Sequence, residues 1–273
     1  MKFARFAKAF APIVAIGLAA AVSGCDGATV RMNGEEGEEL SELDLSGAAP
    51  TELVLLGPDE VRVTTGEKLA ITLGGDGDAQ KQVRFTLKDG ALGVLRADSK
   101  VFDRNEGIAV INVTMPAPRD VTMAGSGKVT LAALARDAKV NVAGSGTIEA
   151  NAIDSDSLDV TIAGSGHFRG AGRAGELKLS VVGSGNAALD ALKVDKADVT
   201  IAGSGDTAFA SDGEVKASIV GSGEVRVKGR ARCTVSAMGS GRLVCENGVQ
   251  DKAAPSAPQP PEAPKAPEKP GGE

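Results

Sequence analysis

The sequence predicts an all-β fold, a right-handed parallel β-helix (β-solenoid), and two observations support that prediction. The tripeptide Gly-Ser-Gly recurs seven times, at steps of 19, 20, 19, 20, 18 and 18 residues. Apolar and polar residues alternate on both sides of each tripeptide, which is typical of half-buried strands. A repeat of this length indicates one structural unit stacked on copies of itself. The tripeptides begin at Gly125, Gly144, Gly164, Gly183, Gly203, Gly221 and Gly239.

Each repeat is expected to contain a strand, a Gly-Ser-Gly corner, a second strand and a looser return. Apolar residues stand four and two positions before the first glycine in every repeat, and Thr, Asn or Ser stands between them. Glycine suits the corner because it reaches positive φ and lets neighbouring backbones come close. No proline lies between residues 119 and 254, so continuous hydrogen-bonded ladders are possible there.

A column of alternating charge favours stacked coils over antiparallel hairpins. Five residues before the first glycine, six successive repeats carry Asp120, Lys139, Asp159, Lys178, Asp198 and Lys216. In stacked coils these neighbours lie about 4.8 Å apart, and each opposite pair adds a few tenths of a kcal/mol. A slip by one coil would bring like charges together, so the column also protects the register. The usual crossover preference makes the helix right-handed.

Two cysteines flank the last corner. Cys233 and Cys245 lie six residues on either side of Gly239, both at positions of the apolar alternation. In an exported protein such a pair is expected to form a disulfide, worth about 3 kcal/mol for so short a loop. It would clamp the last coil, where the sheet otherwise ends in an open edge. A redox or metal pair is the alternative, but the spacing is not CxxC and no histidine lies nearby in sequence.

The N-terminus has the features of a bacterial signal peptide over residues 1–24. Three basic residues precede an apolar segment from Ala9 to Ala21, which is short for a membrane span. The following segment, Val22 to Cys25, resembles the lipobox of bacterial lipoproteins. This resemblance implies lipidation of Cys25 and a membrane partner through that anchor, in the cell envelope. Cleavage nearby by ordinary signal peptidase, giving a soluble periplasmic protein, is the alternative.

The composition divides the rest of the chain into three parts. Residues 25–44 are expected to be an acidic linker, and residues 45–248 the β-helical domain, with the repeats at 119–248. Residues 249–273 are expected to be a disordered tail, since seven of the 12 prolines lie between Pro255 and Pro270. Before the repeats, turn residues separate strand-like runs that we interpret as irregular first coils or a cap. These runs are 52–56, 61–65, 69–73, 83–87, 91–96 and 108–115.

Charge and residue types argue against several function classes. Without residues 1–24 the chain has 27 Lys and Arg against 36 Asp and Glu, a net charge of −9, which argues against nucleic acid as a partner. His167 is the only histidine, so a histidine-based triad or multi-histidine zinc site is not expected. The Gly-Ser-Gly motif matches neither a phosphate loop nor a nucleophile elbow. The sequence therefore predicts no catalytic set, no metal and no cofactor.

The repeated strings T-I-A-G-S-G and S-I-V-G-S-G, with the upstream strand I-N-V-T-M-P at 111–116, resemble a known family. They are similar to the head GIN domain of auto-transporter adhesins, over most of residues 45–248. The resemblance implies an exported protein with a right-handed β-helical fold, and it brings no catalytic or binding residues. No β-barrel translocator follows in this sequence, and the lipobox sets the chain apart from members that have a plain signal peptide.

These observations predict a non-enzymatic, lipid-anchored envelope protein that presents a rigid β-helix for adhesion or partner binding. The partner would be an envelope protein or a polysaccharide. Two alternatives remain open at this stage. One is a polysaccharide-active enzyme, which would need two or three carboxylates converging in a groove. The other is an envelope scaffold or stress-accessory protein with a partner at the Pro-rich tail.

Overall fold

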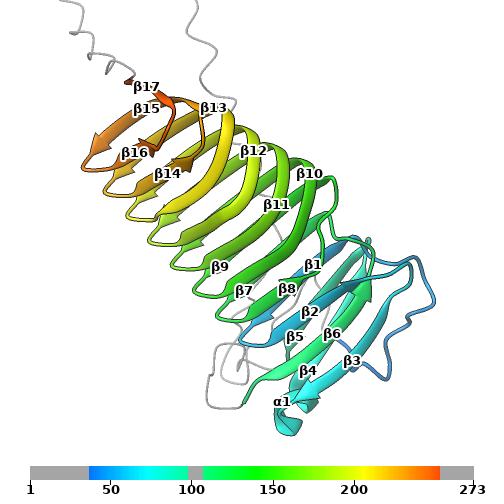
Figure 1. The fold of residues 1–273 in the computed structure, drawn as a ribbon. Helices are drawn as coiled ribbons and strands as arrows, with labels where there is room; N and C mark the ends of the chain where they lie inside the picture. Colours follow the sequence, from blue (N-terminus) through cyan, green and yellow to red (C-terminus); the bar gives the residue numbers. More distant parts are fainter. Residues whose placement is uncertain (1–36, 98–106, 253–273) are drawn as a thin grey trace, which may run out of the picture.

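The computed structural model describes residues 37–97 and 107–252, and these form a parallel β-solenoid, as predicted (Figure 1). Hydrogen bonds join 17 strands of the described residues into one continuous sheet that is wound into coils. The first elements are β1 (Glu52–Gly57), β2 (Glu60–Thr65), β3 (Ala70–Gly75), α1 (Gly77–Gln82), β4 (Val83–Lys88), β5 (Ala91–Arg96) and β6 (Ala109–Met115). The repeats form β7 (Asp120–Gly125), β8 (Lys128–Leu131), β9 (Asp137–Gly144), β10 (Thr147–Gly164), β11 (His167–Gly183), β12 (Asn186–Gly203), β13 (Thr207–Gly221), β14 (Glu224–Lys228), β15 (Arg232–Gly239), β16 (Arg242–Cys245) and β17 (Val249–Lys252).

Each coil contributes one strand segment to each of two long faces. Face A contains the segments that lead into the corners: β1, β7, β9, the second halves of β10 to β13, and β15. Face B contains the segments that follow the corners: β2, β8, the first halves of β10 to β13, β14 and β16. The expected looser return is wrong for β10, β11, β12 and β13, which run as strand from face B into face A. Register shifts accommodate this turn, for example between Ala150 and Ile153.

The corners show why two glycines are needed. Gly144 has φ +109°, and a Cβ on it would lie 2.5 Å from the carbonyl oxygen of Gly125 in the preceding coil. A Cβ on Gly146 would lie 2.4 Å from the oxygen of Gly127. Between them, the backbone N–H of Ser145 donates to the oxygen of Gly125 at 2.9 Å. The backbones of adjacent corners therefore lie so close that neither glycine position has room for a Cβ.

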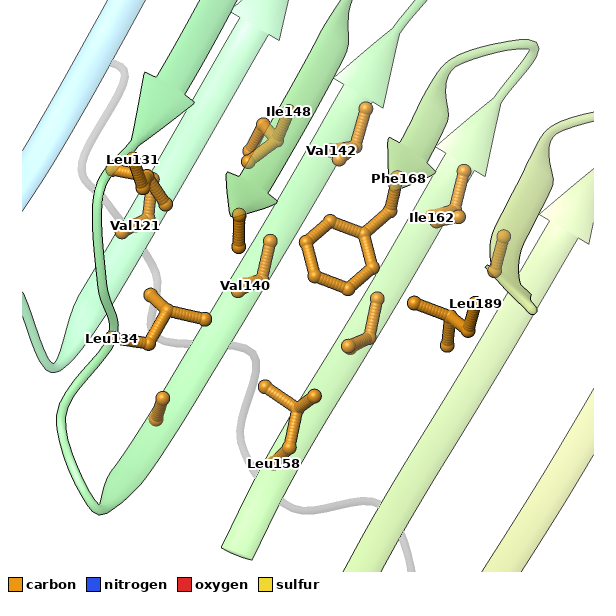
Figure 2. Packing of buried hydrophobic residues seen from close by; sticks show 14 of the residues in the cluster. Val121, Leu131, Leu134, Val140, Val142, Ile148, Leu158, Ile162, Phe168 and Leu189 are labelled. Carbon is orange, nitrogen blue, oxygen red and sulfur yellow. The ribbon is translucent and has the colours of Figure 1, made fainter. Parts of the chain in front are cut away.

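The core is a thin aliphatic layer between the two faces. The residues two and four positions before each corner glycine are buried, except Ala237 near the last coil. Figure 2 shows such residues, among them Val121, Val140 and Ile162, pointing into the interior with Phe168 from face B. Branched aliphatic side chains fit a pleated surface on a short coil, so few aromatic residues are required.

The first coil in the chain is not the first in the stack. β1 pairs in parallel with β7 on one side and with β5 on the other, and β2 pairs likewise with β8 and β6. The coil formed by β5 and β6 therefore lies outside the coil formed by β1 and β2. The six predicted strand-like runs all form strands, but their order in the stack was not predicted.

Antiparallel strands close this end of the solenoid. β3 pairs antiparallel with β6, and β4 pairs antiparallel with β5. Between β3 and β4 lies the short helix α1, whose N-cap carboxylate, Asp76, accepts hydrogen bonds from the backbone N–H groups of Asp78 and Ala79. The sequence predicted only turn residues between these two strands, so the helix is an addition. The two strands cover the outer edges of the parallel ladders, which are otherwise exposed to pairing with other chains.

Both predicted domain boundaries need correction. Leu40 and Leu43, assigned to the acidic linker, pack against the core, and Glu38 forms a backbone bridge with Phe85. At the other end Val249 to Lys252, assigned to the tail, form β17 on face A, paired with β15. Apolar side chains and free ladder edges thus extend the ordered domain beyond residues 45–248. Among the described residues, no helix is long and apolar enough to cross a membrane.

Candidate functional site

The charge column lies in register along face A. Asp120 lies opposite Lys139, which lies opposite Asp159 on its other side, and the alternation continues through Lys178, Asp198 and Lys216. The predicted side-by-side order of opposite charges is confirmed, although no ion pair within 4.0 Å joins two members of the column within the described residues. Lys216 instead contacts Glu214 at 3.2 Å, on its own strand. Ion pairs between coils form in other columns, such as Arg136 with Asp156 at 2.7 Å.

Beside the charge column, face A carries a strip without charged side chains, here called the neutral strip. It consists of three outward columns that run along the seven repeats. The first column contains Thr122, Asn141, Thr161, Ser180, Thr200, Ser218 and Ser236. The second contains Ala124, Ala143, Ala163, Val182, Ala202, Val220 and Met238. The third is the corner serines Ser126, Ser145, Ser165, Ser184, Ser204, Ser222 and Ser240.

The neutral strip is straight, exposed and small. The strands of face A stay in register from the charge column to the corner glycine, so each column is continuous. Its largest apolar side chains remain exposed: Val182 by 56%, Val220 by 52% and Met238 by 71%. Coil and residue spacings give a strip of about 29 by 13 Å, or roughly 400 Å². A standard protein interface buries about 800 Å² per partner, so the strip alone suits a thin or repeated partner.

On face B, an open hollow of about 220 Å³ lies between β12, β13 and β14 in the described part of the chain. It arises because one outward column changes size along the stack. Five residues after the corner glycine, successive coils carry Arg169, Ala188, Ala208 and Arg226 in register. The two alanines form a low floor between the two long side chains, and the hollow lies over that floor.

Three carboxylates, Asp190, Asp206 and Glu224, line this hollow. Lys228 reaches across one coil to Asp190 at 2.8 Å, and this hydrogen bond lowers the pKa of Asp190. Arg242 donates to Glu224 from the next coil and lowers its pKa, with help from Arg226. Both carboxyls are therefore ionised at neutral pH. Glycoside hydrolysis needs one carboxylic acid with a raised pKa, and these two are shifted in the opposite direction.

A buried ion pair that the sequence did not predict lies at the capped end, which is the part of the solenoid formed by β1 to β6. Asp59 and Arg96 are 1% and 0% exposed, and the guanidinium donates to both carboxylate oxygens, at 2.6 and 2.9 Å. The N–H of Ala109 donates to the same carboxylate. Asp59 ends an eighth corner, Gly57-Pro58-Asp59, in register with Gly125. In the sequence only Gly57 marks this corner, because Pro58 and Asp59 stand where the repeats have serine and a second glycine.

The predicted disulfide is confirmed. Cys233 on β15 and Cys245 on β16 are bonded, with their Cα atoms 6.7 Å apart, and they link the two faces within the last coil. Cys25, the predicted lipidation site, lies outside the described residues. Within residues 37–97 and 107–252, no group of three or more His, Cys, Asp or Glu side chains is arranged to hold a metal ion. His167 lies half-buried on face B, in the column that begins each post-corner strand.

The fold is similar to that of several solved structures. A protein from Bacteroides fragilis, described as a putative adhesin, is 18% identical with a TM-score of 0.63 over 72% of this chain and 92% of its own. A "putative lipid binding protein" from Parabacteroides distasonis is 20% identical with a TM-score of 0.56, over 72% and 93%. A "putative adhesin" from Parabacteroides merdae is 18% identical with a TM-score of 0.55, over 72% and 92%. No curated protein matches the chain.

The sequence of the corners and of the strands before them also matches a family of proteins. The model of the family described as "Putative auto-transporter adhesin, head GIN domain" covers residues 49–231. That range includes the capped end and all but the last Gly-Ser-Gly corner. The chain belongs to this head GIN domain family.

Proposed function

We propose that the protein is a non-enzymatic, lipid-anchored component of the cell envelope that presents its solenoid for adhesion to an envelope protein or a polysaccharide. The observation that carries the proposal is the neutral strip of face A. In a chain with excess acidic residues, this strip repeats small polar and apolar side chains at one spacing along seven coils. Such repetition lets a partner with its own repeat make many equivalent weak contacts.

Membership of the adhesin family and the features of residues 1–25 support the remaining parts of the proposal. The signal peptide and the lipobox-like segment would place Cys25 at the membrane. Several acyl chains on one residue give stable anchoring, because each buried methylene contributes about 0.8 kcal/mol. The paired and ionised carboxylates of the face B hollow favour binding over hydrolysis.

An adhesion assay on whole cells tests the proposal. Cells that express the full chain are compared with cells that express Cys25→Ala, or the double variant Ala163→Glu with Ala202→Glu. The test surfaces carry envelope polysaccharide or envelope protein. Loss of the anchor should release the protein from the membrane fraction and abolish retention of the cells. The two glutamates should leave the protein in the membrane fraction but reduce retention, because they place charge in the neutral strip.

Thr130→Glu on face B serves as the control, since it adds a glutamate at an outward position away from the strip. It should leave retention unchanged. If Cys25→Ala remains in the membrane fraction, the anchor is wrong. If the double variant adheres as well as the wild type, the neutral strip is not the adhesive surface.

A further inference from the structure

We propose that the face B hollow is a binding site for one neutral saccharide unit. The inference rests on the proposed function, because it names a ligand class for an adhesive protein, but it concerns the face opposite to the neutral strip. Its basis is the combination of an alanine floor, a rim of balanced charge, and polar groups of the rim that lack partners within the described structure.

The floor supplies a small apolar surface. Ala188 and Ala208 lie opposite each other on adjacent coils, and Ala187 lies buried beside them. A pyranose ring has one face of C–H groups that prefers such a surface to water. The same column holds Arg169 and Arg226 on the two flanking coils, so the ring would be bounded at both ends.

The rim is electrically balanced. Asp190, Asp206 and Glu224 contribute three negative charges. Three positive charges come from Arg226 and, just outside the hollow, from Lys228 and Arg242. Both arginines pair with Glu224 and Lys228 pairs with Asp190, while Asp206 has no ion pair among the described residues. At Asp190 and Glu224 an ion would have to compete with these pairs, whereas a neutral polyol can use the remaining donors and acceptors, the carboxylate of Asp206 among them, without separating a pair.

The rim also has free hydrogen-bonding capacity. Asn186 accepts the N–H of Asp206 through Oδ1 at 3.0 Å, and Asp206 accepts the N–H of Glu224 through Oδ1 at 2.8 Å. Among the described residues, Nδ2 of Asn186 and Oδ2 of Asp206 have no further partner. One donor and one acceptor therefore stand on adjacent coils at the edge of the hollow, as a pair of sugar hydroxyls requires.

The volume of the hollow limits the size of the ligand. The hollow, at about 220 Å³, has room for a small molecule, and one monosaccharide ring is the unit that we assign to it. Sites for drug-sized ligands are larger, typically about 300 Å³ or more. So small a ligand on an open site binds weakly, with a Kd in the millimolar range. Adhesion would then depend on many copies of the protein on one surface.

The test is a titration of the purified, isotope-labelled full chain with single sugars, followed by amide chemical shifts. The probes are glucose, galactose and N-acetylglucosamine, with glucuronate and glucosamine as charged analogues. We expect at least one neutral sugar to shift the amides of Asn186, Asp206 and Ala208 with a millimolar Kd. The charged analogues should bind more weakly.

Two variants separate binding from folding. Ala208→Gln fills the hollow from an outward position without adding charge, and should weaken binding at least tenfold. Asp206→Asn keeps an oxygen for the N–H of Glu224 but loses the ionised acceptor, and should weaken binding by about tenfold. Thr130→Gln, in the same column four coils away, is the matched control and should leave binding unchanged. All three should melt as the wild type does.

No shift from any neutral sugar at about 50 mM, well above the expected Kd, would overturn the inference. So would shifts confined to residues outside the hollow, tighter binding of a charged analogue, or unchanged binding to Ala208→Gln. Failure here leaves adhesion through the neutral strip untouched. Conversely, sugar binding by a protein that does not support adhesion would refute the proposed function alone.

Discussion

The repeat coils and the capped end build the same solenoid by different means. In the repeats, from β7 to β16, one corner is used seven times, and successive coils follow the order of the chain. At the capped end the coils are out of order, two strands are antiparallel, and the eighth corner has Pro58 and Asp59 instead of Ser and Gly. Both parts share the aliphatic core; in addition, the repeats have backbone contacts too close for side chains, and the end has a specific buried ion pair. A repeated structure can therefore use the same corner in every coil, whereas its end needs contacts that occur only once.

The largest expected effect on stability concerns a corner of the repeat coils. Gly203 has φ +134°, and a Cβ on it would lie 2.1 Å from the oxygen of Gly183. Gly203→Ala should lower the free energy of unfolding by about 5 kcal/mol, because it combines backbone strain with a backbone clash. Chemical denaturation measures the change. Gly77→Ala is the control, since its Cβ would meet nothing within 4 Å. Equal stability of the two variants would show that the corner can relax.

The next effect tests the capped end. Asp59→Ala leaves the buried guanidinium of Arg96 without its carboxylate and should lower the free energy of unfolding by about 3 kcal/mol. Hydrogen exchange should show that β1, β2, β5 and β6 open first. Asp156→Ala, which removes an exposed pair with Arg136, is the control and should cause no measurable change. Uniform loss of protection along all coils would contradict a separate role for the capped end.

The smallest effect concerns the charge column. Lys178→Glu places a negative charge between Asp159 and Asp198, which lie opposite it on the two adjacent coils. Because no direct ion pair is lost, the cost should be only a few tenths of a kcal/mol, and it should shrink as salt is added. Melting temperatures at low and high salt measure it. A large change that does not depend on salt would mean that Lys178 acts through packing.

The sequence predicted the repeats well because their information is local and repeated. The glycine spacing and the two-residue alternation predict the strands, the corners and the buried columns. Cys233 and Cys245 both stand at apolar positions of that alternation, which predicts their disulfide. The coil order could not be predicted, because the strand pattern of β5 and β6 does not show on which side of β1 and β2 they stack. The pair of Asp59 with Arg96 joins residues 37 positions apart with no shared motif. The hollow depends on Ala188 and Ala208, and these leave a space only because Arg169 and Arg226 occupy the same column on the flanking coils.

The displaced first coil has a consequence for how the molecule is made. Any chain emerges N-terminus first, from the ribosome or from a translocation channel. β1 and β2 need β5 and β6 on one side and β7 and β8 on the other, so their neighbours are incomplete until Leu131 has emerged. Coil-by-coil growth from the N-terminus is therefore impossible at the beginning. β1 and β2 stay unpaired until β5 and β6 have emerged, and their other edges stay open until β7 and β8 follow. A chaperone would be needed most in this period.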